Sequence, residues 1–302
     1  MEKRYSYPKD KIKILLLENV HEVAAERLRE AGYSVETLPR SLGPDELGEH
    51  IKDVHVLGIR SKTKVLPEHL AEARKLLAIG CFGVGTNQVP LDAAANHAVP
   101  IFNAPYGSTR SVAELTIAHV IYLARRAVDK IIRMHEGHWL KSAKGAHEVR
   151  DKVMGIVGYG HIGQQVGLLA EAVGMRVLFH DKIKRLALGT AKAVESFDEL
   201  LAKADYVSLH VPALADGRAL LDRERLAKMK QGSCILNLGR GTLIDLDALK
   251  EALESGHLAG AALDVYPGEP KTNNEPFECV LAGVENAILS PHLGGSTQEA
   301  QY

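Results

Sequence analysis

The feature that most constrains this chain is a glycine-rich turn at residues 152–163, which reads K-V-M-G-I-V-G-Y-G-H-I-G. A strand-like apolar run ends in Gly158, Gly160 and Gly163, and a helical pattern follows at once. This order is typical of a dinucleotide-binding turn. The first glycine permits the tight turn, the second lets the backbone approach a pyrophosphate, and the third lets helix and strand pack closely. The phosphates would bind free N–H groups at the helix N-terminus, where the helix dipole favours negative charge.

A second feature indicates which dinucleotide binds. The next strand-like run, 175–179, is followed by His180 and Asp181. Asp181 lies about 20 residues beyond the turn, where the acid that binds the adenosine ribose is expected. A carboxylate there accepts hydrogen bonds from ribose hydroxyls and repels a 2′-phosphate, so we expect NAD rather than NADP. The alternative, an ordinary turn between strand and helix, fits this context less well.

Length and composition set the class of protein. At 302 residues the chain is long enough for two domains. With 37 Lys and Arg against 38 Asp and Glu, it gives no sign of a nucleic-acid or membrane surface. Its three cysteines are far apart and form no C-x-x-C, so we expect neither disulfides nor a metal site. No apolar run is long enough for a signal peptide or a membrane span, which favours a cytoplasmic protein.

Strand and helix patterns alternate from the N-terminus. The strand-like runs of the first third are 12–17, 34–38, 54–59, 76–81 and 99–102, separated by helical patterns. Short links between such elements predict parallel β-α-β units. The segment 103–107 then breaks the rhythm, and a long apolar helix is predicted over 111–134, with Ser111 and Glu114 as a capping box. Its apolar content suggests a place between domains or against a second subunit.

The same rhythm continues after residue 151. Six strands are predicted, at 153–157, 176–179, 206–211, 234–238, 261–265 and 287–290. Six strands that begin with the glycine turn are enough for a complete doubly wound domain. The predicted fold class is therefore α/β, with two doubly wound parallel-sheet domains.

Three polar residues follow strands of the second half: Arg240 in N-L-G-R-G-T, Glu269 in D-V-Y-P-G-E-P and His292 in S-P-H-L-G-G. Ligands of open parallel sheets bind beyond the carboxyl ends of the strands, so we expect all three at one site. Hydride transfer between NAD and a hydroxy acid needs a base for the hydroxyl proton, and histidine titrates in the right range. A neighbouring carboxylate fixes the imidazole tautomer, and a guanidinium binds a substrate carboxylate through two hydrogen bonds. Singly, each residue has an ordinary structural explanation; their shared position favours a catalytic set.

These motifs also carry a family resemblance. G-Y-G-H-I-G, N-L-G-R-G-T, A-L-D-V-Y-P-G-E-P and S-P-H-L-G-G-S-T, in this order, resemble the NAD-dependent D-2-hydroxyacid dehydrogenase family over essentially the whole chain. Within it, A-I-G-C-F-G-V-G-T-N-Q-V and T-R-S-V-A-E-L resemble bacterial members that oxidise D-3-phosphoglycerate to 3-phosphohydroxypyruvate, the first step of L-serine biosynthesis. The resemblance implies a catalytic set of Arg240, Glu269 and His292, with His292 as acid and base, and a homodimer or homotetramer.

The resemblance further implies a set of NAD contacts and a domain plan. Beyond the three glycines and Asp181, the implied cofactor contacts are His161, Ile162, His210, Leu238, Gly239, Asp264, Gly294 and Gly295. A Rossmann NAD-binding domain, 108–295, is expected to be inserted in a flavodoxin-like substrate-binding domain, 1–107. The family completes that domain with 296–302 and with C-terminal helices beyond Tyr302. Serine regulation, for which related bacterial enzymes often carry a further domain, is not assumed.

A phosphorylated substrate needs cationic contacts beyond the carboxylate grip. Arg60 and Ser61 follow the strand-like run 54–59, and we expect them, with Asn103 and the backbone near Gly83, to hold the substrate's carboxylate and phosphate. A solvated R-S-K-T turn is the competing interpretation. Lys141 resembles a basic residue that a neighbouring subunit lends to the site.

Two other functions stay open from the sequence. The first is a dehydrogenase or reductase for another D-2-hydroxy acid, such as 2-oxoglutarate, hydroxypyruvate or glyoxylate. The second is a non-catalytic NAD-sensing binding protein, which can share the fold and keep the same three residues. The absorbance of NADH at 340 nm separates enzyme from sensor.

Overall fold

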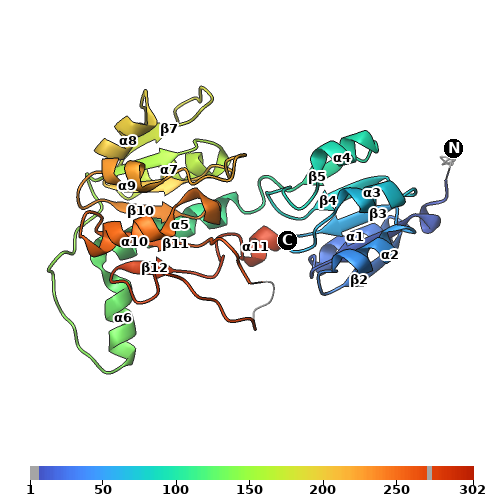
Figure 1. Cartoon of the computed structure of the whole chain (residues 1–302), viewed down its shortest axis with the longest axis horizontal. Coiled ribbons are helices and arrows are strands. Elements are labelled where there is room, and N and C mark those ends of the chain that lie inside the picture. The colour runs from blue at the N-terminus through green and yellow to red at the C-terminus, as the bar shows by residue number, and fades with distance from the viewer. Residues whose placement is uncertain (1–6, 271–273) are drawn as a thin grey trace. The chain divides into compact units, whose positions relative to one another are not determined.

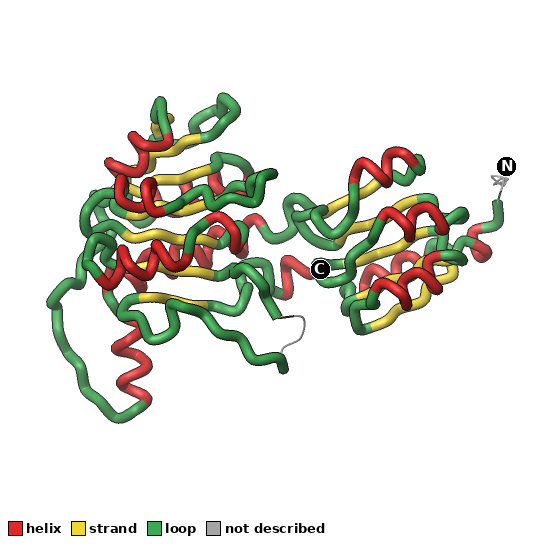
Figure 2. Tube along the Cα trace, in the orientation of Figure 1, coloured by secondary structure: helices red, strands yellow, loops and turns green. Residues whose placement is uncertain are grey.

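The computed structural model describes residues 7–270 and 274–302. It divides into two compact units. Unit 1 holds the described residues up to Ser108 together with Gln298–Tyr302, and unit 2 is Thr109–Thr297. Each unit is built on one parallel sheet (Figure 1), and Figure 2 shows the strands of each sheet with helices packed beside them. The predicted α/β class is therefore confirmed.

Unit 1 has a five-stranded sheet with the order β2-β1-β3-β4-β5, all neighbours parallel. Two of its helices, α2 and α3, begin with a proline, whose fixed φ suits the first helical turn. One sheet face packs on α2, α3 and α4 through residues such as Leu47, Leu70 and Ala94. A smaller core lies under α1 at Ile14, Leu16 and Ala25. The elements are η1 Lys9–Lys11, β1 Lys13–Leu17, α1 Glu22–Glu30, β2 Ser34–Leu38, α2 Pro44–Ile51, β3 Val56–Ile59, α3 Pro67–Glu72, β4 Ala78–Cys81, α4 Leu91–Asn96, β5 Ile101–Asn103 and α11 Gln298–Gln301.

Unit 2 has a seven-stranded parallel sheet with the order β12-β11-β10-β9-β6-β7-β8. Strand order reverses at β6, which pairs with β7 on one side and β9 on the other. Ligands of such sheets bind where the order reverses, beyond the carboxyl ends of the strands. The elements are α5 Thr109–Arg125, α6 Ala127–His135, β6 Val153–Val157, α7 His161–Ala172, β7 Arg176–His180, β8 Lys192–Ala193, α8 Phe197–Lys203, β9 Tyr206–Leu209, α9 Arg223–Lys228, β10 Cys234–Asn237, η2 Gly241–Leu243, α10 Leu246–Glu254, β11 Gly260–Leu263 and β12 Ala287–Leu289.

Helices cover both faces of this sheet. Helices α5 and α7 pack on each other over one face, with Val120, Leu123 and Val166 in the shared core. Helices α8, α9 and α10 cover the other face above a second core that includes Leu200, Leu226 and Leu249. Burial on both faces explains why β6 reads as a continuous apolar run rather than as an alternating pattern. Strand β10 is likewise buried and is apolar up to its last residue, Asn237. In the part of the chain described, no helix has the length and apolarity needed to span a bilayer.

The structure corrects three predictions. The long helix is broken at Arg126, whose φ of 46° is left-handed, so α5 and α6 are separate. The capping box is wrong, because α5 begins at Thr109 and Ser111 lies inside it, paired with Thr297 Oγ1 at 2.8 Å. Val112, Val120 and Leu123 of helix α5 lie in the core of unit 2. A seventh strand, β8, was also missed, because two residues with exposed side chains carry no apolar run.

Candidate active site

The glycine turn lies between β6 and α7, and the three glycines differ in their surroundings. At Gly158 the φ of 90° is left-handed, and a Cβ would lie 2.5 Å from the carbonyl oxygen of His210. At Gly163 a Cβ would lie 2.1 Å from the carbonyl oxygen of Gly158. At Gly160, which directly precedes α7, a Cβ would meet nothing within 4 Å. The chain's own packing therefore requires two of the glycines, and the third leaves open space at a helix N-terminus, where a pyrophosphate fits.

Asp181 follows β7 and is bound to this turn. Its carboxylate accepts the N–H of Tyr159 at 2.9 Å and the N–H of Ile183 at 3.0 Å, and Arg185 Nε lies 3.2 Å away. Burial favours the neutral acid, but these hydrogen bonds and the Arg185 charge outweigh burial and hold the pKa of Asp181 below its ordinary value. An ionised carboxylate beside the turn is the acceptor that ribose hydroxyls require. These residues fit a dinucleotide.

The other predicted cofactor residues lie at the carboxyl ends of neighbouring strands. His210 follows β9, and its Nε2 lies 2.9 Å from Ser208 Oγ. Burial lowers the pKa of His210 to about 4, so the ring is uncharged at neutral pH and contributes no cation. Because all strands run parallel, the remaining residues meet at the same edge: His161 and Ile162 at the start of α7, Leu238 and Gly239 after β10, Asp264 after β11, and Gly294 and Gly295 after β12.

The structure brings His292 and Glu269 together. His292 Nδ1 lies 2.8 Å from Glu269 Oε2, and Glu269 Oε1 accepts the N–H of Tyr266 at 3.1 Å. The hydrogen bond to Glu269 raises the pKa of His292, and the Glu269 and Asp264 charges add to it, against burial and the Arg240 charge. Burial opposes ionisation of Glu269, but the bonds from His292 and Tyr266 hold its pKa below its ordinary value. The carboxylate thus fixes one ring nitrogen and leaves Nε2 for chemistry.

Arg240 lies close enough to this pair for its charge to lower both pKa values. Its main chain is fixed, since Asn237 Nδ2 donates to the Arg240 carbonyl at 2.9 Å. The next residue, Gly241, packs so tightly that a Cβ would lie 2.0 Å from the carbonyl carbon of Tyr266. The loops that carry Arg240 and Glu269 are therefore in contact. A guanidinium beside an acid–base pair is suited to a substrate carboxylate.

Asp264 has a structural role that the sequence did not indicate. The side chain is buried and accepts three bonds, from Ser290 Oγ at 2.6 Å, Leu293 N at 2.7 Å and Gly294 N at 2.7 Å. These donors flank His292, whose φ of 53° is left-handed. We call residues 290–295 the His292 loop. Asp264 holds this loop from the end of the adjacent strand β11.

In unit 1, the predicted substrate residues lie at the carboxyl ends of β3, β4 and β5. Asn103 Nδ2 donates to the Val84 carbonyl at 2.8 Å, so Asn103 and the turn at Gly83 are neighbours. Arg60 and Ser61 follow β3, and Gln88 Nε2 donates to the Arg60 carbonyl at 2.7 Å. Lys141 of unit 2 is exposed and shares the wall of a cavity with Arg126 and Asp129.

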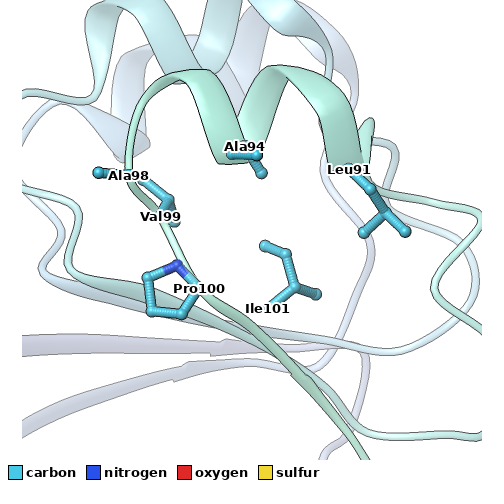
Figure 3. Close-up of a pocket in the computed structure, with 7 residues that line it drawn as sticks. Leu91, Ala94, Ala98, Val99, Pro100 and Ile101 are labelled. Carbon is cyan, nitrogen blue, oxygen red and sulfur yellow. The ribbon is translucent and has the colours of Figure 1, made fainter.

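A separate hollow in unit 1 does not suit an anionic substrate. Figure 3 shows it between α4 and the strand that follows, lined by Leu91, Ala94, Val99 and Ile101 among others, all without charge. The described residues also contain no group of three or more His, Cys, Asp or Glu that could hold a metal ion.

Comparison with known proteins gives a consistent picture. A family model described as "D-isomer specific 2-hydroxyacid dehydrogenase, NAD binding domain" matches residues 117–294. A D-3-phosphoglycerate dehydrogenase of Dictyostelium discoideum is 50% identical over 301 residues, covering 100% of this chain and 74% of the relative. One from Escherichia coli K12 is 48% identical, covering 99% and 73%. A solved NAD-dependent formate dehydrogenase from Staphylococcus aureus in complex with NAD is 28% identical with a TM-score of 0.82, covering 96% and 91%.

Proposed function

This chain belongs to the D-isomer specific 2-hydroxyacid dehydrogenase family, and from that membership we propose that it oxidises D-3-phosphoglycerate to 3-phosphohydroxypyruvate, the first step of L-serine biosynthesis. The cofactor is NAD. The geometry that carries the proposal is the Glu269–His292 pair beside Arg240, at the same sheet edge as the glycine turn. The substrate assignment is supported by relatives of that name, which match essentially all of this chain at 48–50% identity.

The arrangement explains the chemistry of oxidation. His292 Nε2 accepts the proton of the substrate hydroxyl, and the Glu269 carboxylate stabilises the imidazolium that forms. Arg240 binds the substrate carboxylate through its planar fork of donors. Bound NAD supplies the hydride acceptor. In the reverse direction the protonated imidazole returns its proton to the carbonyl oxygen, so reduction requires the charged form of His292.

The substrate phosphate requires further donors, which we assign to unit 1. Arg60 supplies a cation, and Ser61, Asn103 and the main chain at Gly83 supply neutral hydrogen-bonding groups at adjoining strand ends. We assign Lys141 to the site of a neighbouring subunit. Cys81, Cys234 and Cys279 are free thiols, which supports a reducing, cytoplasmic location.

We also propose that the enzyme is a homodimer or homotetramer that pairs through α6. This helix has no buried residue, and it extends away from the sheet of unit 2 with the segment that follows it (Figure 1). Ile132, Met134, Trp139 and Leu140 are all more than half exposed along this stretch. Exposed apolar side chains that gather in one place mark association surfaces. Ile132→Asp should lower the mass measured by light scattering to that of a smaller assembly, and an unchanged mass would exclude α6.

The test of the function is an absorbance assay at 340 nm with NAD and a panel of 2-hydroxy acids, run in both directions. We expect D-3-phosphoglycerate to give a kcat/KM at least about tenfold above D-lactate, D-glycerate and D-2-hydroxyglutarate, because only it satisfies the phosphate contacts. A higher kcat/KM for another acid would identify that acid as the substrate and would leave the assignment as a 2-hydroxyacid dehydrogenase unchanged. No absorbance change with any acid, despite measurable NAD binding, would favour the NAD-sensing protein.

A further inference from the structure

The turn that follows β1 in unit 1 has an unusual backbone. Strand β1 ends at Leu17, and the next two residues, Glu18 and Asn19, have φ values of 63° and 51°. Both are left-handed without being glycine. Such conformations are disfavoured for residues with a Cβ, and they persist where the surrounding structure determines them. The surroundings of Glu18 therefore require an explanation.

Glu18 is buried, with 8% of its surface exposed, and its side chain binds the main chain of another loop. Oε2 accepts the N–H of Lys62 at 2.9 Å and Oε1 accepts the N–H of Thr63 at 2.8 Å. The main-chain oxygen of Glu18 lies 3.5 Å from Arg60 Nη1, a long contact. We call residues 60–63 the Arg60 loop. Glu18 thus contacts both its main chain and the guanidinium.

A second buried residue also holds this loop. Gln88 is 4% exposed, and its Nε2 donates to the Arg60 carbonyl at 2.7 Å. The R-S-K-T sequence has no proline to fix its backbone, so these two side chains supply the restriction. The Glu18 carboxylate binds N–H groups and not the guanidinium, which leaves the Arg60 charge for an anion.

We propose that Glu18 is a positioning residue for substrate binding: it fixes the Arg60 loop so that the guanidinium is already aimed when the anionic substrate arrives. The inference rests on the proposed function only in giving Arg60 an anionic 2-hydroxy acid to bind. A loop that is ordered before binding loses less conformational entropy when it binds, so the effect belongs in KM rather than in kcat.

The experiment is a double-mutant cycle with Glu18→Gln and Arg60→Ala, assayed with D-3-phosphoglycerate. Glutamine replaces one acceptor by an amide that faces an N–H, so one hydrogen bond to the Arg60 loop is lost. We expect Glu18→Gln to raise KM about tenfold with kcat nearly unchanged, the usual effect of losing a charged hydrogen bond. In the Arg60→Ala background we expect no further rise in KM, because Glu18 then has no guanidinium to aim. Glu26→Gln, the same change on the exposed surface of α1, should leave KM unchanged.

Two further measurements keep the outcome decisive. Hydrogen exchange of the main-chain amides at 62 and 63 should be faster in Glu18→Gln, and the melting temperature reports whether the variant is folded. If it does not fold, Gln88→Leu provides the second route to a loosened Arg60 loop and should also raise KM. An unchanged KM in a folded variant with faster exchange, or an equal KM rise with and without Arg60, would overturn the proposal. If the wild-type chain oxidises a different acid, the proposed substrate is wrong. The role of Glu18 is then tested by the same double-mutant cycle, with KM measured for that acid.

Discussion

The Arg60 loop of unit 1 and the His292 loop of unit 2 are fixed by the same device. In each unit a buried carboxylate at the end of one strand accepts two main-chain N–H groups from the loop after the adjacent strand. Glu18 follows β1 and holds the loop after β3; Asp264 follows β11 and holds the loop after β12. Both strand pairs are parallel neighbours. A parallel sheet ends its strands at one edge, so a short acidic side chain there reaches the next loop.

The two loops differ in where the strained backbone lies. In the His292 loop the left-handed residue is His292 itself, whereas in unit 1 it is the holding residue Glu18 and its neighbour. His292 is also oriented by a second carboxylate, Glu269, and Asp264 accepts a third donor from Ser290. Proton transfer depends on the direction and tautomer of a short side chain, so its main chain must be fixed. Anion binding by arginine also depends on geometry, through the planar fork of the guanidinium, but the long side chain places that fork farther from the main chain.

The largest effect is expected from His292→Ala. We expect kcat for oxidation to fall by roughly 10²–10⁴-fold, the usual contribution of a general base. NAD affinity should hardly change, because the glycine turn and Asp181 stay intact. Steady-state kinetics and NAD titration by fluorescence measure the two quantities. Turnover within a few-fold of wild type would exclude His292 as the base. The His292 loop would then have no catalytic role to compare with that of the Arg60 loop.

Glu269→Gln should lower turnover less, by roughly 10–100-fold, and should also move the pH profile. Glu269 is the main cause that raises the pKa of His292 above its ordinary 6.5. Oxidation needs the neutral imidazole, so its rate rises with pH through that pKa, and the loss of Glu269 should shift the acidic limb to lower pH. Asp264 still raises the pKa and Arg240 still lowers it. If the acidic limb of the pH dependence of kcat/KM is at the same pH in the variant as in the wild type, the group that titrates there is not His292.

Asp264→Asn tests whether the hydrogen bonds that fix the His292 loop contribute to activity, as we infer for the Arg60 loop of unit 1. An amide replaces one of the two oxygens that accept three donors, so we expect kcat to fall about tenfold and the free energy of unfolding to fall by about 2 kcal/mol. Ser290→Ala removes one donor and keeps both N–H bonds, so its effect should be smaller. A rise in the NAD dissociation constant with unchanged kcat would instead make Asp264 a cofactor contact.

The sequence predicts much of this arrangement, and its failures have a common cause. The run at 153–157 matches β6 to the residue, because a buried parallel strand reads as an apolar run bounded by turns. The weaker run at 34–38 also matches β2 to the residue, although β2 is an edge strand with no buried residue. The expectation that ligands bind beyond the carboxyl ends of parallel strands led to Arg240, Glu269 and His292. It did not lead to Glu18, although Glu18 also follows a strand. Its partner Lys62 is 44 residues away, and which loop lies beside it depends on strand order, which no local pattern records. The break at Arg126 is likewise a left-handed turn without a glycine.

The smallest effect is expected from Arg60→Lys, which separates charge from geometry in unit 1. Lysine keeps the cation but loses the planar fork that binds an anion through two parallel bonds. We expect KM for D-3-phosphoglycerate to rise by about three- to tenfold with kcat unchanged, and Arg60→Ala to raise it further. Lys62→Arg is the matched control, since it exchanges the same two side chains in the opposite direction on the same loop. If Arg60→Lys lowers kcat as strongly as it raises KM, the arginine acts in the transition state, and the two loops are closer in function than their geometry suggests.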